Sequence, residues 1–232
     1  MMKIDNAAIF PTTISRTKIE VSEEEKDRWF DLYLTHSNDE GKSHDFWGFE
    51  KVQTDERFHD LFMDRLRKGV DAYFDALSIN TSKIDVQLTK CFFNVTDRSA
   101  VTLHDHAENH LSFTYYPHIA EGKARDIIFY IDTHNNEPYT HFFGYTLDES
   151  TVNNSTREGF PVSEGALFIF PSKLTHDIER RNGDGRGNQP FLDKESLRKT
   201  RFCVAGDMLY TRKNDIDVYN RLLSAPENWR KL

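Results

Sequence analysis

Histidine and glutamate recur at every second position in one short stretch of this chain, at His104, His106, Glu108 and His110. Alternate side chains of an extended strand point to one face, so these four can share a side. A later apolar run, residues 166–170, is followed by a turn and then by His176. Imidazole is a good ligand for zinc, copper, iron and nickel. The two stretches therefore predict two halves of one mononuclear metal site.

The near half of this site can be filled in two ways. One pairs His104 with His106, and the other pairs His106 with Glu108, while His176 is the distant ligand in both. Two ligands at i and i+2, with a distant third, can cap one face of an octahedral ion. The pair with Glu108 would give the 2-His-1-carboxylate triad of non-haem iron oxygenases. Spacing alone does not distinguish iron from zinc.

The N-terminal part of the chain carries the periodicity of helices that would pack on a sheet. A short strand is expected at residues 9–14. Ser22 has the position of an N-cap with acidic residues after it, which predicts a helix to about Leu34. From Glu56 to about Leu77, apolar residues recur at three- and four-residue spacing, which predicts an amphipathic helix. We interpret both helices as a packing layer.

From residue 79 to near the C-terminus the sequence favours β-strands. Aromatic residues make up 13% of the chain, and they favour a β-rich core. The expected strands are 86–95, 112–116, 127–131, 141–146, 166–170 and 202–210. The pattern predicts a mainly β fold with N-terminal helices. Its core would be a double-stranded β-helix, of the jelly-roll or cupin-like kind, packed by those helices.

A single domain is expected over the whole chain, residues 1–232. Its three parts are an N-terminal strand with helices, a jelly-roll core and a closing segment, at residues 1–80, 84–212 and 213–232.

Two further segments have a predicted role. Residues 216–229 are expected to close the chain as a short helix. The glycine-rich stretch 181–188 lacks the strand-before and helix-after context of a phosphate loop. With its flanks, as residues 181–192, and together with residues 153–160, it is expected to form a lid that excludes water from the site.

Composition restricts the partners. The net charge of −8 gives no sign of a nucleic-acid partner. No apolar run approaches the ~20 residues that a membrane-spanning helix needs, and the first residues lack a hydrophobic signal segment. Cys91 and Cys203 each lie in an apolar run, which predicts buried thiols. We therefore expect a cytoplasmic protein without a membrane or nucleic-acid partner.

Several motifs together resemble the Fe(II)/2-oxoglutarate-dependent oxygenase superfamily, and within it an uncharacterised bacterial and phage branch. The matching segments are Phe10-Pro11-Thr12, His104-Asp105-His106 through Ser112 to Tyr115-Tyr116, Gly165 through Phe170-Pro171-Ser172 to His176, and Arg201. Ala107 and Glu108 replace a Pro-Asn pair of that branch, and Phe113 replaces a glycine. The resemblance spans most of the chain.

This resemblance implies an activity and a set of cofactors. Fe(II) and 2-oxoglutarate would be the cofactors, and O2 and an unknown substrate the other partners. The substrate would be hydroxylated at a C–H bond, with release of succinate and CO2. Arg201 is the candidate for the distal carboxylate of 2-oxoglutarate, because a guanidinium fork matches a carboxylate. Tyr116 and Asn94 are further candidates for binding this cosubstrate.

The run from Asn94 to His104 also resembles the run before the H-x-D motif of prolyl 4-hydroxylases. That register makes His104 the first ligand and puts His106 in the carboxylate position. It favours His104, His106 and His176 as ligands, with Glu108 as the alternative.

Two other functions fit the same residues. One is a cupin-like metal-dependent isomerase or hydrolase, and the other is a non-catalytic metal-binding protein of phage or bacterial type. Neither would need Arg201 to hold a dicarboxylate. The sequence identifies neither the substrate nor the oligomeric state.

Overall fold

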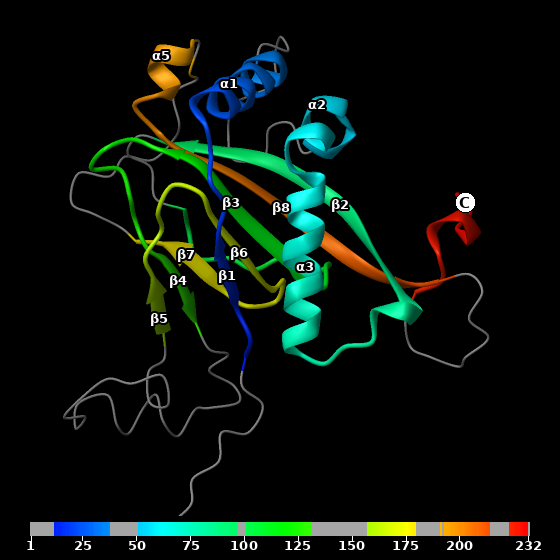
Figure 1. Ribbon diagram of the computed structural model, residues 1–232. Helices are drawn as coiled ribbons and strands as arrows, with labels where there is room; N and C mark the ends of the chain where they lie inside the picture. The colour runs from blue at the N-terminus through cyan, green and yellow to red at the C-terminus, as the bar shows by residue number, and fades with distance from the viewer. Residues whose placement is uncertain are drawn as a thin grey trace, which may run out of the picture.

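Two antiparallel sheets face one another in the computed structural model, and helices cover the outer face of the larger sheet (Figure 1). The structure describes residues 12–37, 51–96, 101–130, 157–179, 191, 193–213 and 223–231. Within them, the five-stranded sheet has the order β1 (Ser15–Lys18), β6 (Ala166–Pro171), β3 (Leu111–Ile119), β8 (Arg201–Arg212) and β2 (Ile84–Thr96). The three-stranded sheet of this described part has the order β5 (Arg157–Phe160), β4 (Ile127–Tyr130) and β7 (His176–Ile178).

The two expected N-terminal helices are present. The first is α1 (Glu23–Ser37), and the second is a continuous helical run of α2 (Glu56–Phe58), a π-helical turn η2 (His59–Met63) and α3 (Asp64–Ala76). Ser22 caps α1 as predicted: its Oγ accepts a hydrogen bond from the Glu25 backbone N–H, and its own N–H donates to the Glu25 carboxylate. Asp55 caps α2 by accepting from the Arg57 backbone N–H.

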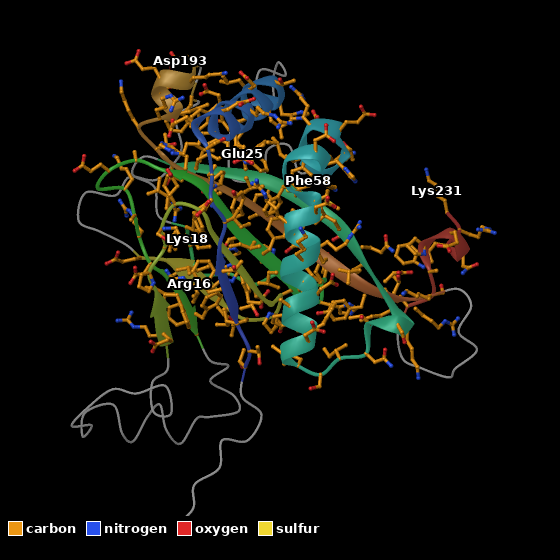
Figure 2. All side chains as sticks on the ribbon, viewed as in Figure 1. Arg16, Lys18, Glu25, Phe58, Asp193 and Lys231 are labelled. Carbon is orange, nitrogen blue, oxygen red and sulfur yellow. The ribbon has the colours of Figure 1, made fainter. Side chains whose placement is uncertain are left out.

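Strand alternation divides the apolar residues between two cores. On β3, Phe113 and Tyr115 face the helices, whereas Tyr116 faces the smaller sheet. On β8, Phe202 and Val204 likewise face the helices. Figure 2 shows side chains filling the space between α3 and the sheet. Residues of the opposite parity on β2, β3 and β8 therefore face the space between the two sheets. Polar side chains at these positions can contact the segment around residue 104.

Some elements were not predicted. The strand expected at 9–14 is displaced: residues 12–14 are not in a strand, the four-residue strand β1 begins only at Ser15, and residues 9–11 lie outside the described part of the chain. Two short strands and a short helix have no periodic signal: β5, β7 and α5 (Lys194–Leu197). Residues 157–160 pair with β4 as strand β5, so this part of the expected lid is sheet.

Several expectations concern residues that the structure does not describe. These are the strand at 141–146, residues 153–156 and 181–190 of the lid, residue 192, and residues 216–222 of the closing segment. In the described end of the chain, the short 3-10 helix η4 (Pro226–Asn228) takes the place of the expected helix. Within the described ranges, no helical segment combines the length and the apolar character that a transmembrane span requires.

Gly165, directly before β6, packs against Ile19, directly after β1, and has a positive φ that other residues rarely adopt. Its φ is +80°, and a Cβ at this position would lie 2.0 Å from the Ile19 carbonyl oxygen. We expect Gly165→Ala to lower the free energy of unfolding by roughly 4 kcal/mol or more, measured by urea denaturation. Gly122 is the matched control, because its φ is +72° but nothing lies within 4 Å of the added Cβ. Gly122→Ala should cost only about 1–2 kcal/mol, and equal losses in the two variants would contradict the clash.

Candidate metal centre

The segment before β3 and the first residue of β7 are joined through their backbones. His104 and His176 form an isolated antiparallel bridge, with N–H to O distances between heavy atoms of 3.1 and 2.9 Å in the two directions. The His106 N–H donates to the Ser172 carbonyl at 2.8 Å. Main-chain hydrogen bonds, which do not depend on the side chains, therefore bring these histidines together from distant parts of the sequence.

The three imidazoles converge on one point. One ring nitrogen from each of His104, His106 and His176 lies within 4.8 Å of the others. The ring centroids are 5.1 Å apart for His104 and His106, 4.4 Å for His104 and His176, and 5.4 Å for His106 and His176. This spacing allows all three rings to bind a single ion.

Each of these rings has its Nδ1 engaged by an acceptor. The His104 Nδ1 lies 2.7 Å from the Thr102 carbonyl oxygen, and the His176 Nδ1 lies 2.9 Å from the Leu174 carbonyl oxygen. An imidazole that donates its Nδ1–H in this way carries its lone pair on Nε2, which fixes both the tautomer and the ring orientation for metal binding.

The third ring is held by a carboxylate. The His106 Nδ1 lies 2.7 Å from Oδ1 of Asp207, a buried residue of β8. The Ser112 hydroxyl donates to the same oxygen at 2.7 Å, and the hydroxyls of Ser112 and Ser172 are 2.9 Å apart. His106 is thus held through its outer nitrogen, as metal-binding histidines commonly are.

Burial keeps two of the imidazoles neutral. Burial, with the nearby His104 ring adding to it, lowers the pKa of His176 to about 3. Burial also lowers the pKa of His104. A metal can bind only the neutral ring, so the site needs no deprotonation of His176 at neutral pH.

The lowered pKa of His176 predicts a pH-dependent stability. Below its ordinary pKa of 6.5 the unfolded chain takes up a proton that the folded chain does not, so stability falls as the pH falls. From His176 alone, the free energy of unfolding of the metal-free protein should drop by about 1 kcal/mol from about pH 6.5 to about pH 5.5. Carboxyl groups add little to this drop, because they titrate mostly at lower pH. Urea unfolding at both pH values should show this drop, and His176→Gln should reduce it; an unchanged drop in the variant would contradict the assignment.

The alternation expected for His104, His106, Glu108 and His110, with all four on one face of a strand, is only partly present. Residues 107 and 108 form a turn, which ends the strand-like alternation. Glu108 is exposed and lies outside the three-histidine cluster. His110 points elsewhere: its Nδ1 accepts from the Tyr210 backbone N–H at 2.8 Å, and its ring lies 4.8 Å from the Tyr210 ring. Of the two predicted ligand sets, the structure brings together the one with His104.

Arg201 lies in the same pocket as the histidines. It is the first residue of β8 and 2% exposed, and its Nε and Nη1 have no hydrogen-bond partner among the described residues. Its guanidinium carbon lies 5.9 Å from the centroid of the Tyr116 ring. A buried guanidinium with open N–H groups is costly without an anion, so this arrangement is suited to bind one.

The other two predicted cosubstrate-binding residues also line this pocket. Burial raises the pKa of Tyr116, so its hydroxyl stays protonated and can donate a hydrogen bond. Asn94 has a buried Oδ1 without a partner in the described part of the chain. The pocket is lined by the three histidines, by Asn94, Ser112, Thr114, Tyr116, Arg201 and Cys203, and by Phe92, Val101, Phe113, Ile127, Phe170, Ile178 and Ala205.

Asp207 was missed by the sequence reasoning, although a signal was present. A single acidic residue lies within the apolar strand pattern of residues 202–210. If that strand is buried, the carboxylate must meet a polar group, because burying it without a partner is costly. It also has the same strand parity as Arg201, which already pointed to the site.

No family model matches the chain, and no curated protein matches it. Solved structures do. The non-heme alpha ketoglutarate dependent carbocyclase SnoK from nogalamycin biosynthesis is 10% identical, with 89% of this chain and 84% of that chain covered and a TM-score of 0.52. The non-heme alpha ketoglutarate dependent epimerase SnoN from the same biosynthesis is 9% identical, with 85% and 78% covered and a TM-score of 0.51. SnoN has also been solved in complex with Fe3+, alpha ketoglutarate and nogalamycin RO, with the same TM-score of 0.51.

Identities this low show a shared fold. Together with the two facing antiparallel sheets, they confirm the predicted fold class, a jelly-roll core packed by helices.

Proposed function

We propose that this chain is a non-haem Fe(II)- and 2-oxoglutarate-dependent oxygenase that hydroxylates a C–H bond of its substrate. The observation that supports this most strongly is a single pocket lined both by the three histidines and by the buried Arg201. Three imidazoles are a ligand set for a transition metal, and a buried guanidinium with two nitrogens unpartnered among the described residues is a binding group for a carboxylate. A dicarboxylate that also binds the metal would use both.

Fe(II) would be held by Nε2 of His104, His106 and His176. The donor set fits, since imidazole suits iron, although it suits zinc and nickel as well. Iron is favoured because SnoN, which shares the fold, has been solved with Fe3+ and alpha ketoglutarate, another name for 2-oxoglutarate. The proposed ligand set omits Glu108, which lies outside the cluster.

Arg201 would bind the distal carboxylate of 2-oxoglutarate. Its Nε and Nη1 both have open N–H groups, and the planar guanidinium can present a pair of donors that matches the two oxygens of a carboxylate. The protonated hydroxyl of Tyr116 and the side chain of Asn94 are additional polar groups of the same pocket. These groups would give the cosubstrate one orientation.

In the reaction, the residues of the protein hold the metal and the cosubstrate and exclude water from the pocket. Iron with 2-oxoglutarate, when bound, supplies the oxidising chemistry that activates O2 and releases succinate and CO2. His104, His106 and His176 present neutral nitrogens in a fixed orientation. Arg201 anchors the cosubstrate on the β8 side of the pocket. The apolar walls, among them Phe92 and Phe170, keep water away from the reacting groups.

The test uses the purified chain with Fe(II) and 2-oxoglutarate under anaerobic conditions. We expect the visible charge-transfer band of an iron-bound 2-oxoglutarate chelate, and on admission of O2 the formation of succinate. Zn(II) in place of Fe(II) should give neither and serves as the control. Iron that binds without the band and without consumption of 2-oxoglutarate would contradict the proposal.

A second function is favoured by one observation. In the part of the chain that the structure describes, the cluster contains three histidines and no carboxylate, which departs from the 2-His-1-carboxylate triad. A cupin-like metal-dependent isomerase or hydrolase would accept such a set and would need no anchor for a dicarboxylate. Metal-dependent activity that survives Arg201→Ala would favour it.

The proposal extends to the organisation and location of the chain. We propose one domain, a cytoplasmic location supported by two free buried cysteines, and membership of the bacterial and phage branch that the motifs resemble. O2 and a substrate, still to be identified, complete the proposed partners.

A further inference from the structure

One buried carboxylate lies directly behind a proposed metal ligand. Asp207 is 1% exposed, and among the described residues it is the only buried acidic side chain. Its Oδ1 is 2.7 Å from the His106 Nδ1 and also accepts from the Ser112 hydroxyl. A negative charge is costly to bury unless it meets hydrogen-bond donors and a compensating positive charge.

The pairing of β2 with β8 is irregular next to Asp207. The pairing of β2 with β8 shifts between Leu88 and Lys90, so Thr89 is an extra residue opposite Asp207 and Met208. The Thr89 hydroxyl donates to the Asp207 carbonyl at 2.9 Å. Next to it, a Cβ on Gly206 would lie 2.4 Å from the Lys90 carbonyl oxygen, so only glycine fits there. Bulges of this kind redirect a side chain next to an active site.

The negative charge of Asp207 can affect the proposed metal ion through His106. A facial triad with one carboxylate ligand places one negative charge on the metal, whereas three neutral imidazoles place none. Asp207 is one imidazole ring away from the proposed ion, and a carboxylate that accepts from a ligand's outer N–H raises the basicity of that ligand.

We propose that Asp207 is the positioning residue of the metal centre and that, through His106, it supplies the negative charge that a carboxylate ligand would otherwise provide. This inference rests on the proposed metal site and deepens it. Asp207 does not touch the metal itself; it fixes the His106 ring with Nε2 towards the ion and makes that nitrogen a stronger donor.

The first test is the affinity for Fe(II), measured anaerobically, and for Zn(II), both by competition with a chromophoric chelator. Asp207→Asn keeps the shape and an oxygen that can accept from the His106 Nδ1–H, but removes the charge. We expect it to weaken metal binding by roughly 10- to 100-fold. Asp105→Asn is the matched control, since it removes the same charge from an exposed residue between two of the ligands. It should change the affinity by less than about twofold, because solvent screens an exposed charge.

The second test separates a role in charge from a role in folding. His106→Asp puts a carboxylate directly at the ligand position, so Asp207 should become redundant. In that background Asp207→Asn should cost nothing or should improve metal affinity, because it removes a second nearby carboxylate. A double-mutant cycle measures this coupling.

The outcomes are distinct. If Asp207→Asn weakens metal binding by the same factor with His106 and with His106→Asp, Asp207 is merely structural and the inference is overturned. It is also overturned if Asp207→Asn binds metal as tightly as the wild type. If the wild-type chain binds neither Fe(II) nor Zn(II), the proposed function itself fails.

Discussion

His176→Ala should lower the affinity for Fe(II) by more than about 100-fold and abolish 2-oxoglutarate turnover. Losing a direct ligand should cost more than losing an outer partner of a ligand, which typically costs about 10- to 100-fold. The fold should survive, because His176 is bridged to His104 through main-chain atoms that alanine retains. The ring does pack near Phe170, at 4.9 Å between centroids, so some stability will be lost.

Chelator competition and a succinate assay would measure this result, with circular dichroism as the check on folding. His110→Ala is the control: it removes a histidine from the same stretch that lies outside the three-histidine cluster. It should leave metal affinity unchanged. A His176→Ala chain that holds iron as tightly as the wild type would remove the distant ligand from the site.

Arg201→Ala should raise the KM for 2-oxoglutarate by roughly 10- to 100-fold, since a hydrogen bond to a charged group contributes about 1.5–3 kcal/mol. Metal affinity should be unaffected, because Arg201 is not in the ligand cluster. Arg201→Lys should recover only part of the loss, as it keeps the charge but not the planar fork. Without cosubstrate, Arg201→Met should not lower the stability of the protein, because it removes a buried guanidinium with unpartnered N–H groups.

The measurement is 2-oxoglutarate binding to the iron-loaded protein under anaerobic conditions. Arg212→Ala, at the other end of β8, is the control and should bind like the wild type. Unchanged binding by Arg201→Ala would contradict the anchor and favour the isomerase or hydrolase alternative.

Local signals were enough to predict much of the fold. Ser22 with the acidic residues after it places the start of α1, and the spacing of apolar residues places the helical run from Glu56 to Ala76. Runs of aromatic and β-branched residues place β2, β3, β4, β6 and β8 to within a few residues. These features depend on neighbouring residues, which the sequence displays directly.

What could not be predicted depends on distant pairing. Strand β7 is three residues long and has no alternation to detect; it exists because His176 and its neighbours pair with β4 and with His104. The choice between His104 and Glu108 likewise required the turn at 107–108 and the bridge to His176. The position of Asp207 against His106 depends on the registers of β2 and β3 against β8, which no local pattern encodes.

The most direct test is a crystal structure of the chain grown anaerobically with Fe(II) and 2-oxoglutarate, with the metal located by anomalous scattering. We expect one iron bound by Nε2 of His104, His106 and His176, and 2-oxoglutarate on that iron with its distal carboxylate against Arg201. An iron held by other residues, or a 2-oxoglutarate that leaves Arg201 without a partner, would contradict this arrangement.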